Sequence, residues 1–364
     1  MQLHPVSLDD KYERVAGEVY ITGTQALVRA AVMQRRRDAA AGLKTAGFIS
    51  GYRGSPLHNV DKELWRANRL LADAEILFLP AVNEDLAATA IRGSQEAMAF
   101  PDATHDGVFG MWYGKGPGLD RSIDAIRHGH MAGAAQHGGV LVVVGDDHPL
   151  KETDAPAAHE NLFVDLMMPV LYPATVAEVI EYALHGWALS RFHGGWVGLK
   201  MIPDTIAATA PVPADAAQQQ TIVVPTDVAL PDGGLNLRVP DHWQTMEERL
   251  RRFKLPAALA YLRANALNKV TQTSDRPRYG IIATGKAWTD VRQALVELGI
   301  DTAMARDLGI TVLKLAMPYP SDAGGIRAFA DGLEEVLVVE EKHRLTEMQV
   351  KDALYALPDG RRPR

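Results

Sequence analysis

The chain has 364 residues, and at about 150 residues per domain this length is typical of two to three domains. Hydrophobic residues make up 47% and charged residues 23%, which is the usual balance of a soluble globular protein, so disorder is not the default expectation. The formal charge of −7 argues against a nucleic-acid binder, and the absence of cysteine excludes disulfides, cysteine-bound zinc, cysteine-held iron–sulfur clusters and a thiol nucleophile in this chain.

Short apolar or β-branched segments alternate with longer helical stretches in the first part of the chain. This alternation is typical of βαβ units with a mostly parallel sheet. We predict strands at 46–52, 75–82, 107–113, 138–148 and 196–202. We predict helices at 85–100 and 122–136, and an amphipathic helix at 176–194. The strand at 138–148, GGVLVVVGDDH, has the clearest burial signal.

The composition changes after residue 202. Residues 203–234 are rich in proline, alanine and turn-forming residues, which indicates a linker or a peripheral segment. Residues 243–270 have the pattern of one or two helices broken near Pro256. A second βα series then predicts strands at 279–287, 310–320 and 334–342. We therefore expect an α/β protein with domains at 1–220 and 272–364, joined by a linker and helical connector at 221–271.

Four polar or glycine-rich segments follow predicted strands. They are SGYRGSP, VNED, YGKGPG and GDDH, in that order along the chain. In an open parallel sheet, ligands bind at the carboxyl ends of the strands, where such loops converge. The four segments together predict a site at this edge of the sheet.

The first two of these segments have structural as well as functional interpretations. GYRGSP is either an ordinary βα turn, with Ser55 near the next helix N-cap and Arg53 in solvent, or a site in which Arg53 holds a carboxylate or phosphate. Glu84 in VNED either stabilises the macrodipole of the following helix or acts as a general acid/base or as a hydrogen-bond partner of a heterocycle nitrogen. The spacing leaves both pairs of interpretations open.

YGKGPG has the glycines of a phosphate loop but matches neither of the two common nucleotide-binding patterns. His128, His130 and His137 lie close in sequence, but their spacing does not form a metal site, and we expect solvated histidines.

Polar residues also follow two of the most apolar strands. Asp146, Asp147 and His148 follow a buried strand and must find polar partners. They either cap the following loop or face a substrate. Glu340 and Glu341 end a strand of the second series and are expected to be solvated.

Six strings of this sequence resemble the 2-oxoacid:ferredoxin oxidoreductases, most closely the indolepyruvate (arylpyruvate) branch. They are SGYRGSPL, PAVNEDLAATA, GMWYGKGPGLDRS, GGVLVVVGDDH with HEN downstream, MPVLYPAT and VLVVEEKHRLTE. The resemblance implies a thiamine-diphosphate-binding fold, with residues 1–220 as the pyrimidine-binding domain. It implies that residues 272–364 form a smaller transketolase C-terminal-like α/β domain.

The resemblance also implies roles for individual residues. Glu84 matches the glutamate that hydrogen-bonds the aminopyrimidine of thiamine diphosphate and promotes its imino tautomer. Ser55 matches the hydroxyl that contacts the 2-oxoacid. The glycines expected to line the cofactor and substrate cleft are Gly54, Gly116 and Gly118. Three further residues are expected to bind the substrate: Arg53, Lys115 and His148. Arg53 is included for its chemistry alone. Lys115 replaces a serine that is often seen there, so its role stays open.

Two motifs of the family are missing. The sequence contains no Gly-Asp-Gly motif followed by asparagine for Mg²⁺, and no cysteine for [4Fe–4S] clusters. The resemblance therefore implies an oligomer in which another polypeptide or domain binds the diphosphate with Mg²⁺ and the iron–sulfur clusters. The implied reaction is the oxidative decarboxylation of an aryl 2-oxoacid such as indolepyruvate with CoA, which yields acyl-CoA, CO2 and reduced ferredoxin.

Two alternatives to that reaction stay open. They are a non-catalytic scaffold or regulatory subunit of such a complex, and a non-oxidative thiamine-dependent decarboxylase. We expect a cytoplasmic protein with neither nucleic acid nor membrane as a partner, because the charged N-terminal residues lack the apolar segment of a secretory signal and no window approaches the length of a membrane span.

Overall fold

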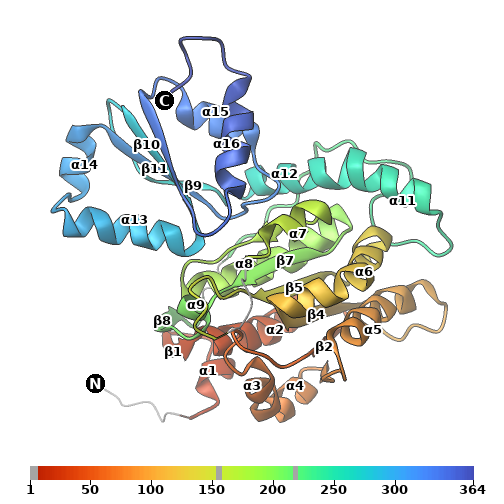
Figure 1. Cartoon of the computed structure of the whole chain (residues 1–364). Coiled ribbons are helices and arrows are strands. Elements are labelled where there is room, and N and C mark those ends of the chain that lie inside the picture. The colour runs from red at the N-terminus through yellow and green to blue at the C-terminus, as the bar shows by residue number, and fades with distance from the viewer. Residues whose placement is uncertain (1–6, 153–157, 216–219) are drawn as a thin grey trace.

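The computed structural model describes residues 7–152, 158–215 and 220–364 (Figure 1). A six-stranded sheet, a four-stranded sheet and a two-stranded sheet organise these residues. In Figure 1 the four-stranded sheet and its helices form a separate unit above the six-stranded sheet, and a helical segment runs between them at one side.

The six-stranded sheet is entirely parallel, with the strand order β3-β2-β4-β5-β7-β6. Its strands are β2 (Thr45–Gly51), β3 (Ile76–Phe78), β4 (Gly107–Lys115), β5 (Val140–Gly145), β6 (Val170–Leu171) and β7 (Val197–Met201). Every residue of β5 is buried, because helices cover both faces of this central strand. The predicted α/β class is confirmed.

Side chains of β5 alternate between two cores. Leu141 and Val143 pack in a core with α2 (Gly23–Ala40) and α8 (Val176–His193). Val142 and its alternate neighbours pack in a second core with α5 (Glu84–Glu96) and α6 (Gly116–Ala132). The shorter helices of this unit are α1 (Asp10–Glu13), α3 (Val60–Arg66), α4 (Asn68–Asp73), the 3-10 turn η1 (Ala97–Ala99), α7 (Glu160–Asp165) and α9 (Pro203–Ile206).

The helix α8 is not amphipathic, in contrast to the prediction. Buried residues occur on all its faces, and they include His185, Trp187 and Ser190. The reason is that α8 lies between the sheet on one side and the helices α2 and α12 (Leu255–Ala264) on the other. A helix that is covered over most of its surface has at most a weak polar face.

The predicted linker contains regular structure. The strand β8 (Thr209–Pro213) pairs antiparallel with β1 (Glu18–Thr22), a strand near the N-terminus that the sequence pattern did not reveal. The predicted helix break near Pro256 is also wrong. The helices α11 (Trp243–Arg249) and α12 are continuous through the π-helical turn η2 (Leu250–Lys254), so the hydrogen-bonding pattern changes just before Pro256 instead of the helix ending there.

The four-stranded sheet has the order β12-β10-β11-β9. Its strands are β9 (Lys269–Gln272), β10 (Tyr279–Thr284), β11 (Ile310–Leu315) and β12 (Glu335–Val339), and its helices are α13 (Gly285–Glu297), α14 (Thr302–Leu308), α15 (Ala323–Ala330) and α16 (Leu345–Tyr355). The parallel strands β10, β11 and β12 occupy the three predicted segments. The antiparallel edge strand β9 lies at the end of the segment predicted as a connector.

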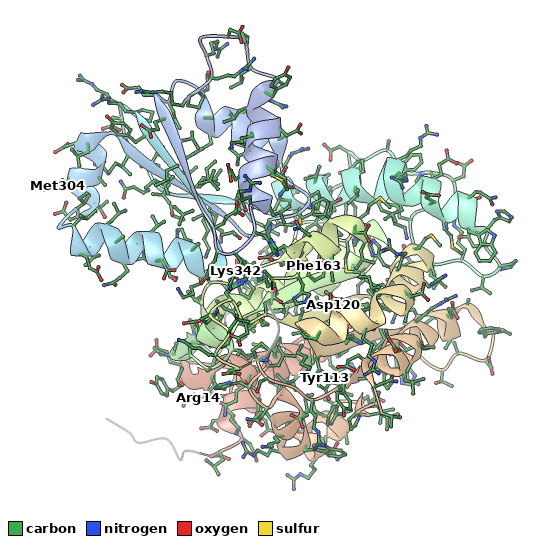
Figure 2. All side chains as sticks on the ribbon, viewed as in Figure 1. Arg14, Tyr113, Asp120, Phe163, Met304 and Lys342 are labelled. Carbon is green, nitrogen blue, oxygen red and sulfur yellow. The ribbon has the colours of Figure 1, made fainter. Side chains whose placement is uncertain are left out.

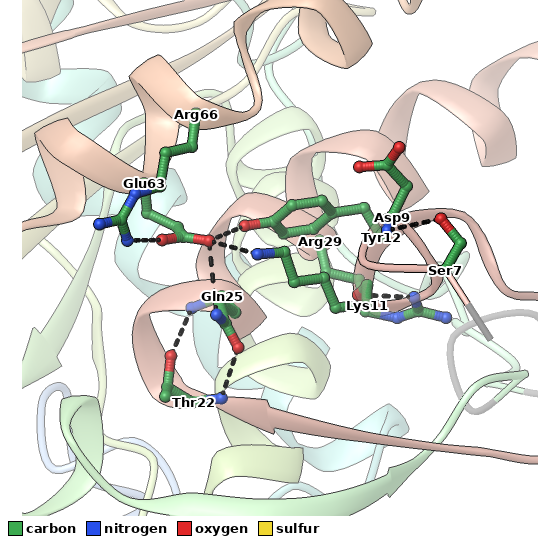
Figure 3. A network of polar contacts seen from close by, with 9 residues as sticks. All are labelled: Ser7, Asp9, Lys11, Tyr12, Thr22, Gln25, Arg29, Glu63 and Arg66. Atoms are coloured by element: carbon green, nitrogen blue, oxygen red, sulfur yellow. Dashed lines mark hydrogen bonds and ion pairs between the residues drawn. The ribbon is translucent and has the colours of Figure 1, made fainter.

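A polar network ties the N-terminal helix to α3, the helix that follows the SGYRGSP loop (Figure 3). Glu63, on the helix α3 that follows this loop, accepts hydrogen bonds from Tyr12, from Lys11 at 3.0 Å and from Arg66 at 3.0 Å. Burial by itself raises the pKa of Glu63, but these three donors outweigh burial and hold the pKa at about 2. The buried Arg29 of α2 donates to carbonyl oxygens that include those of Lys11 at 2.9 Å and Ala214 at 2.7 Å.

We predict that replacing Glu63 by Gln lowers the free energy of unfolding at pH 7 by about 1.5–3 kcal/mol, because charge-assisted hydrogen bonds from three side chains are weakened. Since the folded-state pKa of about 2 lies below the ordinary value of 4.5, this contribution is present above pH 4.5 and is lost as the pH falls towards 2. Urea unfolding of the wild type and the variant at several pH values checks the prediction. A deficit that stays constant down to the lowest pH would contradict it.

Candidate functional site

The loops that follow β2, β3, β4 and β5 meet at one edge of the six-stranded sheet, as the sequence predicted. Gly54 of the first loop lies against the Lys115 side chain, and a Cβ built on Gly54 would lie 3.0 Å from its Cδ atom. Pro56 and Leu57 lie against Gly145 at the end of β5. These approaches place three of the four segments, SGYRGSP, YGKGPG and GDDH, in one contiguous region.

Glu84 is the first residue of α5 and is buried, with 3% of its surface exposed. Asn83 caps the helix by accepting a hydrogen bond from Leu86 N at 2.9 Å, and the backbone oxygen of Glu84 accepts one from Trp112 Nε1 at 3.0 Å. Among the described residues, the buried Oε2 atom of Glu84 has no hydrogen-bond partner. A macrodipole role alone requires no burial of a carboxylate, and an unpartnered buried oxygen is costly unless a further group binds it.

The Gly-Pro-Gly segment is not a loop before the helix, as the sequence suggested, but the first turn of α6. Pro117 is tolerated there because the first helical residues have no intrahelical partner for their N–H groups. A Cβ on Gly118 would lie 2.6 Å from Oε1 of Glu84, and a Cβ on Gly116 would overlap the imidazole of His159. Both glycines therefore make room for a neighbouring side chain.

The SGYRGSP loop exposes both Arg53 and Ser55. The structural interpretation of Ser55 as a helix cap is wrong, since α3 begins at Val60 with Asn59 at its N-cap. Arg53 lies in solvent in this structure. Lys115 is the half-buried N-cap residue of α6, beside Gly54.

A buried network of charged side chains lies next to the Gly-Pro-Gly turn. Asp146 accepts hydrogen bonds from the backbone N of His159 at 2.9 Å and contacts its Nδ1 atom. Asp146 also lies 3.5 Å from Lys200 Nζ, which makes an ion pair with Glu160. On its other side, His159 Nε2 is 3.3 Å from Asp120, a residue of α6 labelled in Figure 2. The sequence string HEN contains two members of this network, but no spacing rule singled them out.

Three groups of this network shift one another's pKa values in favour of their charged forms. Burial by itself lowers the pKa of His159, but the hydrogen bond and charge of Asp146, together with Asp120, raise it above its ordinary value. Burial by itself raises the pKa of Asp146, but Lys200 and His159 hold it at about 2. Burial likewise lowers the pKa of Lys200, yet the charges of Glu160 and Asp146 keep it above its ordinary value.

The residues after β5 divide between two roles. Asp147 caps the following loop, because its carboxylate accepts from the backbone N atoms of Lys151 at 3.1 Å and Glu152 at 2.5 Å. His148 is buried and lines a cavity with Glu160 and Tyr172 of the first unit and with Thr284 and Glu340 of the second. His148 therefore lies on the side of the site that faces the four-stranded sheet.

The two units are joined beside this cavity. Val170 N donates to Tyr319 O at 2.8 Å, and Tyr172 N donates to Ala316 O at 2.9 Å. The carboxyl ends of β10, β11 and β12 thus face the first unit. Glu340 is half-buried rather than solvated as expected, because its carboxylate caps α16 by accepting from the backbone N atoms of Thr346 and Glu347, both at 2.8 Å.

The expectation of solvated histidines on α6 is wrong for His130. This side chain is buried, accepts from Trp196 N at 2.9 Å and contacts Met167 O at 3.2 Å. Burial lowers the pKa of His130 well below its ordinary value. Within the part of the chain that the structure describes, no group of three His, Asp or Glu side chains is placed to hold a metal ion, and no helix is long and apolar enough to cross a membrane.

Comparisons with known proteins agree with this architecture. The chain is 26% identical to the indolepyruvate oxidoreductase subunit IorA of Methanothermobacter marburgensis over 352 residues, which cover 95% of this chain and 50% of that protein. It is 25% identical to IorA of Pyrococcus horikoshii over 361 residues, covering 93% of this chain and 48% of that protein. The chain therefore spans about half the length of the curated relatives that it matches.

Two further comparisons concern one unit and the whole fold. Residues 269–363 match the family described as "Indolepyruvate oxidoreductase domain". A solved 2-oxoglutarate:ferredoxin oxidoreductase from Magnetococcus marinus superposes with a TM-score of 0.68 at 16% identity, covering 96% of this chain and 62% of that one, and so shares its fold. The resemblance to the indolepyruvate branch of the 2-oxoacid:ferredoxin oxidoreductases is thus confirmed as a resemblance: this chain is similar to the IorA subunits over nearly its whole length and shares the fold of a 2-oxoacid:ferredoxin oxidoreductase.

Proposed function

We propose that this chain supplies the pyrimidine-binding half of a thiamine diphosphate site in a 2-oxoacid oxidoreductase. The observation that carries the proposal is the buried Glu84 carboxylate, whose Oε2 atom lacks a hydrogen-bond partner among the described residues and whose Oε1 atom lies over Gly118. An aminopyrimidine ring nitrogen that carries a proton is a fitting donor to such an oxygen. A scaffold subunit without catalysis would gain nothing from burying an unpartnered carboxylate.

The residues present fit the cofactor. Glu84 would hold its pyrimidine through one hydrogen bond, and Gly116 and Gly118 would leave space beside the ring. Thiamine diphosphate, when bound, supplies a nucleophilic carbon and an electron sink for the bond between the keto carbon and the carboxylate. The task of Glu84 is to hold or release a proton at the pyrimidine nitrogen. Ser55 and Arg53, both exposed on the neighbouring loop, would contact the 2-oxoacid together with Lys115, and His148 would border the same cleft.

The reaction that we propose is the oxidative decarboxylation of an aryl 2-oxoacid such as indolepyruvate to acyl-CoA, with CO2 released and electrons passed to ferredoxin. The names of the IorA relatives support the substrate class, and their greater length supports the presence of further parts. A further polypeptide or domain would bind the diphosphate with Mg²⁺ and carry the iron–sulfur clusters, because this chain has no cysteine. Residues 1–220 would be the pyrimidine-binding domain and residues 272–364 the transketolase C-terminal-like domain.

The proposal predicts that the isolated chain binds thiamine diphosphate weakly or not at all, because half of the site is elsewhere. Titration calorimetry with thiamine diphosphate and Mg²⁺ should give no tight binding to the chain alone and tight binding to the complex purified with its partners. CoA-dependent reduction of a viologen dye by the complex with indolepyruvate would distinguish the oxidative reaction from non-oxidative decarboxylation. Tight, Mg²⁺-dependent binding to this chain alone would contradict the proposed division of the site.

A further inference from the structure

The two nitrogen atoms of the His159 imidazole differ in their partners: Asp146 holds Nδ1 firmly, whereas the partner of Nε2 can be replaced. Its side chain is only 7% exposed, and the fully buried Asp146 binds both its Nδ1 atom and its backbone N. Its Nε2 atom faces Asp120 at 3.3 Å, and the Asp120 side chain is 58% exposed. A carboxylate that is mostly in water exchanges its partner for water at small cost. The Nε2 proton of His159 is therefore the end of the ring that a ligand can take over.

The ring also borders the proposed site. It rests directly on Gly116, where a side chain of any size would collide with it. Two residues further along the same helical turn, Gly118 is covered by Glu84. His159 and Glu84 therefore flank the Gly-Pro-Gly turn, and Lys115 joins this turn to Gly54 and the Ser55 loop.

We propose, on the basis of the function proposed above, that His159 donates a hydrogen bond from Nε2 to the keto oxygen of the 2-oxoacid. Because Asp146 binds Nδ1, the proton that faces the substrate is the one on Nε2. When the keto carbon is attacked, the electron pair of the C=O bond moves to the oxygen, and a positioned N–H stabilises the charge that develops there. The Nε2 proton then passes to this oxygen. The imidazole becomes neutral, and its Nδ1–H group still donates a hydrogen bond to Asp146.

The rest of the network supports this role. Lys200 lies 3.5 Å from Asp146, and its charge is the largest of the interactions that lower the pKa of the Asp146 carboxyl. The carboxylates of Asp146 and Asp120 raise the pKa of His159 against the effect of burial, so the ring holds its second proton more readily than an isolated histidine. Both conditions favour a proton donor that is oriented before the substrate binds.

Two substitutions of His159 test the proposal, because each keeps the hydrogen-bond donor at only one of the two ring nitrogen positions. The amide nitrogen of Asn takes the place of Nδ1, and that of Gln takes the place of Nε2. We expect His159→Asn, which keeps the Asp146 contact but loses the substrate donor, to lower kcat by about 10²–10³-fold. We expect His159→Gln to lose the Asp146 contact but to retain at least tenfold more activity than His159→Asn. Thermal unfolding should rank the variants in the reverse order, with His159→Asn the more stable.

The assay uses the complex with its natural partners, phenylpyruvate or indolepyruvate as substrate, and His128→Asn as the control. His128 lies on α6 with its side chain 46% exposed, so its variant should match the wild type in both activity and stability. Two outcomes would overturn the inference. One is that His159→Asn, the more stable variant, is also the more active; the other is that kcat stays within threefold of the wild type for both variants. A wild-type complex that turns over no 2-oxoacid would instead refute the proposed function itself.

Discussion

Replacing Glu84 by Gln is expected to lower turnover of the assembled enzyme at least about a hundredfold, because an amide cannot exchange a proton with the cofactor as a carboxylate does. Folding and assembly should be close to normal, since Gln has the same volume and the Oε2 atom has no hydrogen-bond partner to lose among the described residues. Turnover of indolepyruvate or phenylpyruvate is the measurement, with assembly checked by size. The pyrimidine-binding role predicts a large loss of activity with a small change in stability.

The neighbouring Asp85 provides a matched control for this experiment. It is also an acidic residue in the first turn of α5, but its side chain is 41% exposed and lies 4.0 Å from Arg121. If Glu84 only stabilised the helix macrodipole, Glu84→Gln and Asp85→Asn would each cost a few tenths to about 1 kcal/mol and leave turnover nearly intact. Equal, wild-type-like turnover in both variants would therefore reject the cofactor role of Glu84.

Replacing Lys200 by Met is expected to produce the largest loss of stability. The side chain is fully buried on β7 and makes ion pairs with Glu160 and Asp146, so its removal leaves two buried carboxylates without the lysine charge. Breaking a buried ion pair by removing one partner costs about 3–5 kcal/mol. For a domain of this size that corresponds to a fall in the thermal midpoint on the order of 10 °C, which calorimetry or circular dichroism can measure.

Two further variants show whether this loss arises from uncompensated charge. Adding Glu160→Gln to Lys200→Met removes one of the stranded carboxylates and should recover part of the stability. Lys351→Met breaks an ion pair with Glu347 in which the lysine is 72% exposed, and should cost only a few tenths of a kcal/mol. A Lys200→Met protein as stable as the Lys351→Met protein would mean that the buried network does not hold this region together.

The central sheet and the second βα unit could be predicted from the sequence, because their strands are short apolar segments and the central strands β4, β5 and β7 are buried on both faces. Such strands are continuous apolar segments, as in β5, and the glycine-rich or polar residues that follow them mark the carboxyl edge of the sheet. The position of Glu84 at the start of α5 followed from the same pattern. Each of these features has its signal within one short segment of the sequence, so it could be predicted without knowledge of distant partners.

Features that depend on distant partners could not be predicted. The pairing of β1 with β8 joins segments about 190 residues apart, and both strands are short and partly exposed, so neither has a strong pattern of its own. The start of α6 at Gly116 required the Gly-Pro-Gly segment to be helical, although its glycines favour a turn. Close packing against His159 and Glu84 explains the glycines instead, and only the fold brings those two side chains there.

The contacts of the site residues were likewise predictable only in part from the sequence. The sequence by itself determined that Asp146 follows a buried strand and needs a partner, since buried polar groups are paired. It did not determine which partner, because Asp147 serves the adjacent loop while Asp146 binds His159 and Lys200, which lie on other elements. Only the tertiary structure decided this, because parallel crossover connections bring together, at the carboxyl edge of one sheet, side chains that no sequence spacing relates.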